Sequence, residues 1–96
     1  DVFLASGEGT PEEEALKLLF SLRKNGLSAD KDYLGRSLKA QMKFAGKTGA
    51  RFVAILGPEE LAKGVVTLKN MATGTQTQLP VGDIAKEVQE LLSAKR

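Results

Sequence analysis

Short apolar runs alternate with longer segments of helical periodicity, and this alternation constrains the fold more than any other feature of the chain. Runs at residues 1–5 and 51–57 have the composition of buried strands, and a short polar strand is expected at a sheet edge over 27–34. Strands separated by helices pair in parallel through right-handed crossovers. The short link before residues 65–71 favours an antiparallel partner, followed by a hairpin-like connection to 75–79. We therefore predict one α/β domain, a three-layer α/β/α sandwich on a mixed five-stranded sheet.

The first helix is expected to run from Pro11 to Asn25. Thr10 is a good N-cap residue, Pro11 suits the first helical position, and Glu13 would complete a capping box. Gly26 is expected to end the helix. The side chains predicted to face inward are those of Ala15, Leu16, Leu19, Phe20 and Leu22.

A second helix is expected over residues 35–48, opened by Gly35 and ended by Gly49. At about 100° per residue, its apolar and basic side chains fall on opposite faces, and the basic ones cluster within roughly 80°. A last amphipathic helix from Val81 should cover the sheet. The inward residues are Leu38, Met42 and Ala45 in the second helix and Ile84, Ala85, Val88, Leu91 and Leu92 in the last; the basic stripe is Arg36, Lys39, Lys43 and Lys47.

Positive charge is concentrated in the middle of the chain. Residues 33–82 hold seven basic and two acidic side chains, and residues 33–58 contain no Asp or Glu. Charge of one sign on one segment indicates an anionic partner, while a solvated face is the alternative interpretation.

Several kinds of chemistry are excluded by composition. The chain has neither Cys nor His, so it lacks thiolate or imidazole metal ligands and the bases of the common nucleophilic triads. Residues 6–12, SGEGTPE, occupy the place of a dinucleotide fingerprint, but Glu12 stands where the third glycine belongs and the carboxylates would repel a pyrophosphate. Glu59 and Glu60 diverge by about 100° in a helical turn and form no converging pair. We expect no catalytic residue, metal or cofactor in these residues.

The segments "DVFLA", "EEEALKLLFSLRKNG", "DYLGRSLKAQMKFAGKTGARFVAILG" and "EELAKGVVTLKNMATG", with the closing amphipathic helix, together resemble the C-terminal anticodon-binding domain of histidyl-tRNA synthetases, a family of class II enzymes. The similarity runs nearly end to end. It implies a sheet of order 2-1-3-4-5 with strand 4 antiparallel. It also implies that residues 1–96 are a fragment of a longer synthetase, which agrees with a chain that begins with Asp and enters a strand at once.

The resemblance places tRNA contacts at the start of the second helix, in the turn at residues 57–60 and on the fourth strand. Bases of an anticodon loop are recognised by stacking and polar contacts, whereas mobile lysines suit phosphates. For Tyr33, core packing is as good an interpretation as base stacking. The predicted anticodon contacts are Tyr33, Gly35, Arg36, Lys39, Glu60, Lys69 and Asn70, and the weaker phosphate contacts are Lys43, Lys47 and Lys63.

The resemblance also implies partners beyond this chain. The parent would be a homodimeric, cytoplasmic histidine–tRNA ligase whose own catalytic domain binds ATP and Mg and adjoins this domain. No apolar run approaches the roughly 20 residues that span a bilayer, so we expect no membrane partner. Two alternatives stay open: a protein-interaction or regulatory domain of a synthetase-like paralogue, and a small nucleotide-binding protein, which the acidic first turn disfavours.

Overall fold

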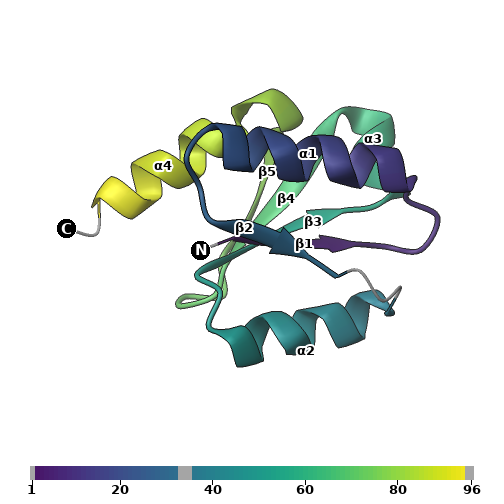
Figure 1. Ribbon diagram of the computed structural model, residues 1–96, viewed down its shortest axis with the longest axis horizontal. Helices are drawn as coiled ribbons and strands as arrows, with labels where there is room; N and C mark the ends of the chain where they lie inside the picture. Colours follow the sequence, from purple (N-terminus) through teal and green to yellow (C-terminus); the bar gives the residue numbers. More distant parts are fainter. Residues whose placement is uncertain (1, 33–35, 95–96) are drawn as a thin grey trace.

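The computed structural model describes residues 2–32 and 36–94, where strands and helices follow in the predicted order (Figure 1). No helix in these two ranges is long and apolar enough to cross a membrane. The strands are β1 Val2–Ser6, β2 Ala29–Lys31, β3 Phe52–Leu56, β4 Val65–Asn70 and β5 Gln76–Pro80; the helices are α1 Glu12–Lys24, α2 Leu38–Thr48, α3 Pro58–Lys63 and α4 Ile84–Ala94.

The sheet has the predicted order β2-β1-β3-β4-β5. β1 pairs in parallel with β2 and with β3, while β4 is antiparallel to β3 and to β5. The parallel pairs are connected by α1 and α2, which are long enough to return the chain to the start of the next strand. The short α3 and Gly64, whose φ is 71°, instead reverse the chain and make β4 antiparallel.

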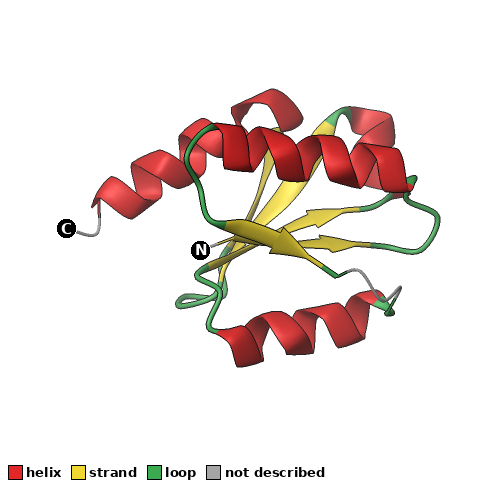
Figure 2. Cartoon of the chain, in the orientation of Figure 1, coloured by secondary structure: helices red, strands yellow, loops and turns green. Residues whose placement is uncertain are grey.

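Helices cover both faces of the sheet, with α1, α3 and α4 on one side and α2 on the other (Figures 1 and 2). Successive strand residues point to opposite faces, so β1 and β3 contribute to two cores. On the α1 and α4 side the central members are Val2, Leu4, Phe52, Ala54, Leu56, Val66, Ile84 and Val88. On the α2 side the buried members are Phe3, Ala5, Ala45 and Val53, with Leu38 and Met42 partly buried against them.

The start of α1 differs from the prediction. Pro11, with φ −62° and ψ 134°, is the N-cap residue, and no side chain of the described residues caps the helix. The Thr10 hydroxyl instead donates to the carbonyl of Leu56 at 3.1 Å. The expected N-cap at Thr10 and capping box at Glu13 were therefore wrong, because Thr10 binds the end of β3. At the other end, α1 stops at Lys24, with Asn25 as its C-cap.

The inward face of α1 was also partly mispredicted. Phe20 is 58% exposed, whereas Leu18 is buried. The buried stripe follows the spacing i, i+3, i+4, i+7, which leaves Phe20 outside it. That stripe is Ala15, Leu18, Leu19 and Leu22.

The second helix begins later than predicted. Its N-cap is Ser37, whose Oγ accepts a hydrogen bond from the backbone N–H of Ala40 at 3.2 Å. Arg36 therefore precedes α2, and Gly35, the expected opening residue, lies outside the described residues. The helix ends at Gly49 as predicted, with φ 75°. The last helix opens as a single 3₁₀ turn, residues 81–83, before α4 begins.

Candidate nucleic-acid interface

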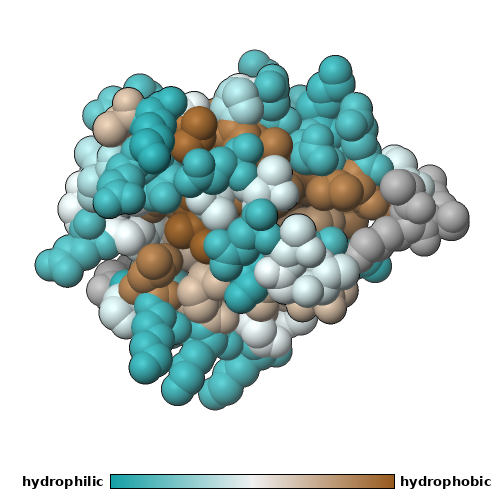
Figure 3. All heavy atoms as spheres, turned by 180° about the vertical axis from the view of Figure 1, so that it is seen from behind, coloured by the Kyte–Doolittle hydropathy of each residue, from teal (hydrophilic) through white to brown (hydrophobic). Residues whose placement is uncertain are grey.

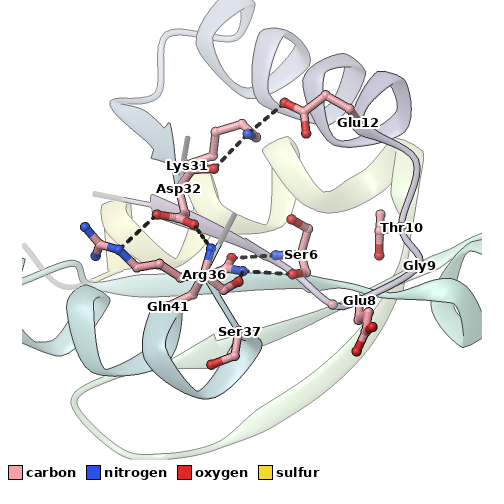
Figure 4. A pocket seen from close by; sticks show the side chains of 11 residues that line it. Ser6, Glu8, Gly9, Thr10, Glu12, Lys31, Asp32, Arg36, Ser37 and Gln41 are labelled. Atoms are coloured by element: carbon pink, nitrogen blue, oxygen red, sulfur yellow. Dashed lines mark hydrogen bonds and ion pairs between the residues drawn. The ribbon is translucent and has the colours of Figure 1, made fainter. Parts of the chain in front are cut away.

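A polar crevice of about 630 Å³ opens at the carboxyl ends of β1 and β2 (Figure 4). It forms because β1 leads to α1 on one face of the sheet, while β2 leads towards α2 on the other. Open α/β sheets usually bind ligands where the connections that follow two neighbouring strands lead to opposite faces of the sheet. Its lining includes Ser6, Thr10, Lys31, Asp32, Arg36 and Gln41.

Gln41 fixes the start of α2 to the end of β1. It is 3% exposed, and its Oε1 accepts from the Ser6 N–H at 2.9 Å. Its Nε2 donates to the carbonyls of Ser6 at 3.0 Å and Arg36 at 2.7 Å (Figure 4). Sequence reasoning missed this residue, although Leu38, Gln41, Met42 and Ala45 share the spacing of one helix face.

Lys31 lies at the crevice wall with only 2% of its side chain exposed. Its Nζ donates to Glu12 Oε1 at 3.0 Å and to the carbonyl of Asp32 at 2.9 Å (Figure 4). The ammonium therefore joins α1 to the end of β2. Within residues 2–32 and 36–94, no cluster of acidic side chains could hold a metal ion.

The side chain of Arg36 is held in place by two contacts. Its Nε is 3.5 Å from Asp32 Oδ1, and the Asp32 side chain is only 5% exposed. The guanidinium carbon lies 4.7 Å from the centroid of the Phe44 ring, a cation–π geometry. The Phe44 ring in turn lies 5.7 Å from that of Phe3. Arg36 is thus pre-organised at the helix start, with 34% of its side chain exposed.

The outer side of α2 is basic. Lys39, Lys43 and Lys47 are all exposed. In Figure 3, hydrophilic side chains project from the lower margin of the molecule, where α2 lies. This helix also carries an open depression, which we call the α2 hollow, lined by Arg36, Ala40, Lys43, Phe44, Gly46 and Lys47.

The turn after β3 lies at the same end of the sheet as the crevice. Gly57 caps α3, and a Cβ added to it would lie 2.7 Å from Glu60 Oε1, so the Glu60 carboxylate folds over this glycine. Gly7 also donates its backbone N–H to the carbonyl of Leu56 at 2.9 Å, which joins the turn after β1 to the end of β3. Lys63 is exposed in the last turn of α3.

Lys69 and Asn70 lie towards the other end of the sheet. Lys69 pairs with Val53 of β3. Val53 precedes Gly57 by four residues, so Lys69 lies roughly 13 Å from the turn at 57–60, measured along the strand. Asn70 Oδ1 accepts from the N–H groups of Ala72 and Thr73 and so stabilises the turn between β4 and β5. The structure therefore brings Arg36 and the turn at 57–60 to one end and leaves Lys69 and Asn70 apart. Tyr33 and Gly35 lie outside the described residues.

Residues 1–91 match the family described as "Anticodon binding domain". The chain belongs to this family. The sheet order and strand directions of the domain are those that the family resemblance implied.

Curated proteins similar to this chain include histidine–tRNA ligases. The chain is 46% identical over 96 residues to a histidine–tRNA ligase of Pelotomaculum thermopropionicum, covering 100% of this chain and 23% of the relative. It is 54% identical over 84 residues to the histidine–tRNA ligase of Symbiobacterium thermophilum, covering 88% and 19%. The anticodon-binding domain thus spans about a fifth of the length of these curated relatives.

Solved structures agree with this assignment. The domain superposes on apo histidyl-tRNA synthetase of S. aureus with a TM-score of 0.83 at 38% identity, covering 91% of this chain and 22% of that one. The histidyl-tRNA synthetase of Nostoc sp. PCC 7120 gives a TM-score of 0.84 at 29% identity, covering 93% and 20%.

Proposed function

We propose that this domain docks the anticodon stem-loop of histidine tRNA as part of a longer histidine–tRNA ligase. The observation that carries the proposal is the 46% identity to such a ligase along the whole chain. The rest of the longer ligase would supply the catalytic domain, which would bind ATP and Mg. The ligase would be a cytoplasmic homodimer. This domain would then contribute by positioning the RNA, while the catalytic groups would lie in the catalytic domain.

Docking would begin with the phosphates. Lys43 and Lys47 on α2 and Lys63 on α3 are exposed point charges on flexible stems, suited to phosphate contacts that carry no base information. Each such contact releases counterions, so binding should weaken steeply as salt rises. A single stem-loop need not contact all three at once.

Recognition of the bases would fall to side chains with fixed geometry. Arg36 is held through its Nε by Asp32, which leaves its terminal nitrogens to donate to a guanine edge. Glu60 would accept from guanine N1 and N2 at the turn after β3. Lys69, at the far end of the sheet, would contact a different base. The other proposed contacts are Tyr33, Gly35, Lys39 and Asn70.

The test separates base recognition from phosphate contact. In the full-length ligase, Arg36→Ala, Glu60→Ala and Lys69→Ala should narrow the gap in aminoacylation efficiency between the cognate tRNA and one with an altered anticodon. A lost base contact is worth about 1–3 kcal/mol of discrimination. Lys43→Ala and Lys47→Ala are the matched controls and should leave that gap intact.

Thermal melts of every variant exclude unfolding as the cause. If Arg36→Ala, Glu60→Ala and Lys69→Ala keep the full difference in aminoacylation efficiency between the two tRNAs, these residues do not read the bases. If the chain shows no anticodon-dependent affinity for the stem-loop in a gel shift, the domain does not serve as an RNA-docking module, and a regulatory role in a paralogue becomes the better account.

A further inference from the structure

The α2 hollow is built by helix spacing. Ala40, Lys43 and Lys47 follow one another at intervals of three or four residues in α2, so they lie on one side of the helix, and Arg36 precedes the helix and lines the same depression. Ala40 and Gly46 are small, and they leave a depression of about 560 Å³ between the longer side chains. Among the described residues, its lining contains three cations and no carboxylate.

An aromatic ring lies in this basic depression. Phe44 is 37% exposed, and among the described residues only Phe20, on the opposite face of the sheet, is another exposed large hydrophobic side chain. Phe44 is not loose, because Arg36 lies over its ring and the ring of Phe3 is tilted against it by 57°. Aromatic rings beside cations are the usual platform for bases of single-stranded nucleic acids.

Gly46 keeps the hollow open at a cost to the helix. It lies inside α2, where glycine is less favourable than alanine by roughly 0.8–1.0 kcal/mol. A Cβ added there would meet nothing within 4 Å, so neither packing nor backbone conformation requires glycine. The open space in front of it is the space a bound group would occupy.

We propose that the α2 hollow holds one nucleotide of the bound RNA. Its base stacks on the exposed surface formed by Phe44 and Arg36, and its phosphate lies between Lys43 and Lys47. The occupant is assigned from charge complementarity, because a lining whose charged side chains are all basic favours an anion, and the Phe44 ring favours a planar base. The inference rests on the proposed function. It adds base stacking by Phe44 to α2, whose lysines are otherwise proposed to contact phosphates.

The chain contains no Trp, which allows a direct test of stacking. Phe44→Trp places a single indole in the hollow, and its emission should be quenched as the anticodon stem-loop is titrated in. Phe20→Trp is the control on the far face and should keep its emission. Inorganic polyphosphate supplies phosphates without bases, so it should bind the Phe44→Trp variant without comparable quenching.

A second test compares RNA affinity with thermal stability in variants of the hollow. Phe44→Ala should weaken stem-loop binding about tenfold, within the range expected for one stacked base. Gly46→Gln fills the hollow without changing charge, and should raise or preserve Tm while weakening RNA binding. Ala62→Gln, at an exposed position of α3, is the matched control and should change neither.

The two proposals fail differently. If the wild-type chain does not bind the stem-loop, the docking function itself is refuted. If it binds, but Gly46→Gln and Phe44→Ala retain wild-type affinity and the Phe44→Trp emission does not change, the hollow is not a nucleotide site. Equal quenching by polyphosphate would likewise refute base stacking.

Discussion

Replacing Gln41 by Met removes the polar link between β1 and α2 while keeping side-chain length and helix propensity. Three hydrogen bonds are lost, two to Ser6 and one to the carbonyl of Arg36. Each is worth about 0.5–1.5 kcal/mol net. Ser6 and Arg36 are half-buried, so water can hydrogen-bond to some of the backbone groups that lose their partner. We therefore expect a loss of about 2 kcal/mol in the free energy of unfolding. For a domain of this size that lowers Tm by about 8–16 °C.

The measurement is thermal and urea unfolding followed by circular dichroism. Gln89→Met is the matched control, because Gln89 lies on the exposed side of α4 and its side chain donates to the carbonyl of Asn25. It should cost less than about 1 kcal/mol, as exposed sites usually do. A Gln41→Met domain that melts within 2 °C (roughly 0.5 kcal/mol by the same scaling) of the wild type would refute the structural role given to this side chain.

Three further outcomes are expected. Val53→Asp would bury a charge at a residue with 0% exposure, so its cooperative melt should be lost at the wild-type temperature. Gly57→Ala should displace the Glu60 carboxylate, and a double-mutant cycle with Glu60→Ala should show that the two changes are not additive. Lys43→Ala and Lys47→Ala should each lower the slope of log affinity against log salt by about one, as measured by fluorescence anisotropy of labelled stem-loop.

The fold was largely predictable because its signals are periodic. The helical segments before and after the short strand at 27–34 specify parallel pairing, and the short link at Gly64 specifies the antiparallel strand. Side-chain direction in α1 was less predictable. Its apolar residues cover more than one face, so periodicity alone could not decide that Leu18 is buried and Phe20 exposed.

The candidate site was predictable only in part. The charge of α2 is visible in sequence, and the structure leaves Lys39, Lys43 and Lys47 exposed. The contacts of Phe44 with Phe3 and of Gln41 with Ser6 join residues far apart in the chain, which no local pattern records. Such contacts depend on how α2 packs on the sheet.

The position of β1 inside the sheet has a consequence for the order of folding. Although it is the first of the five strands in sequence, it lies between β2 and β3, and its residue Val2 pairs with Ala29 and with Phe52. The β4–β5 hairpin closes over a short loop, but the β1–β3 ladder must close a long one, and distant pairings form slowly. Until β3 is available, one apolar edge of β1 stays unpaired and prone to association. Refolding yield should therefore fall with protein concentration more steeply than the small size of the domain suggests.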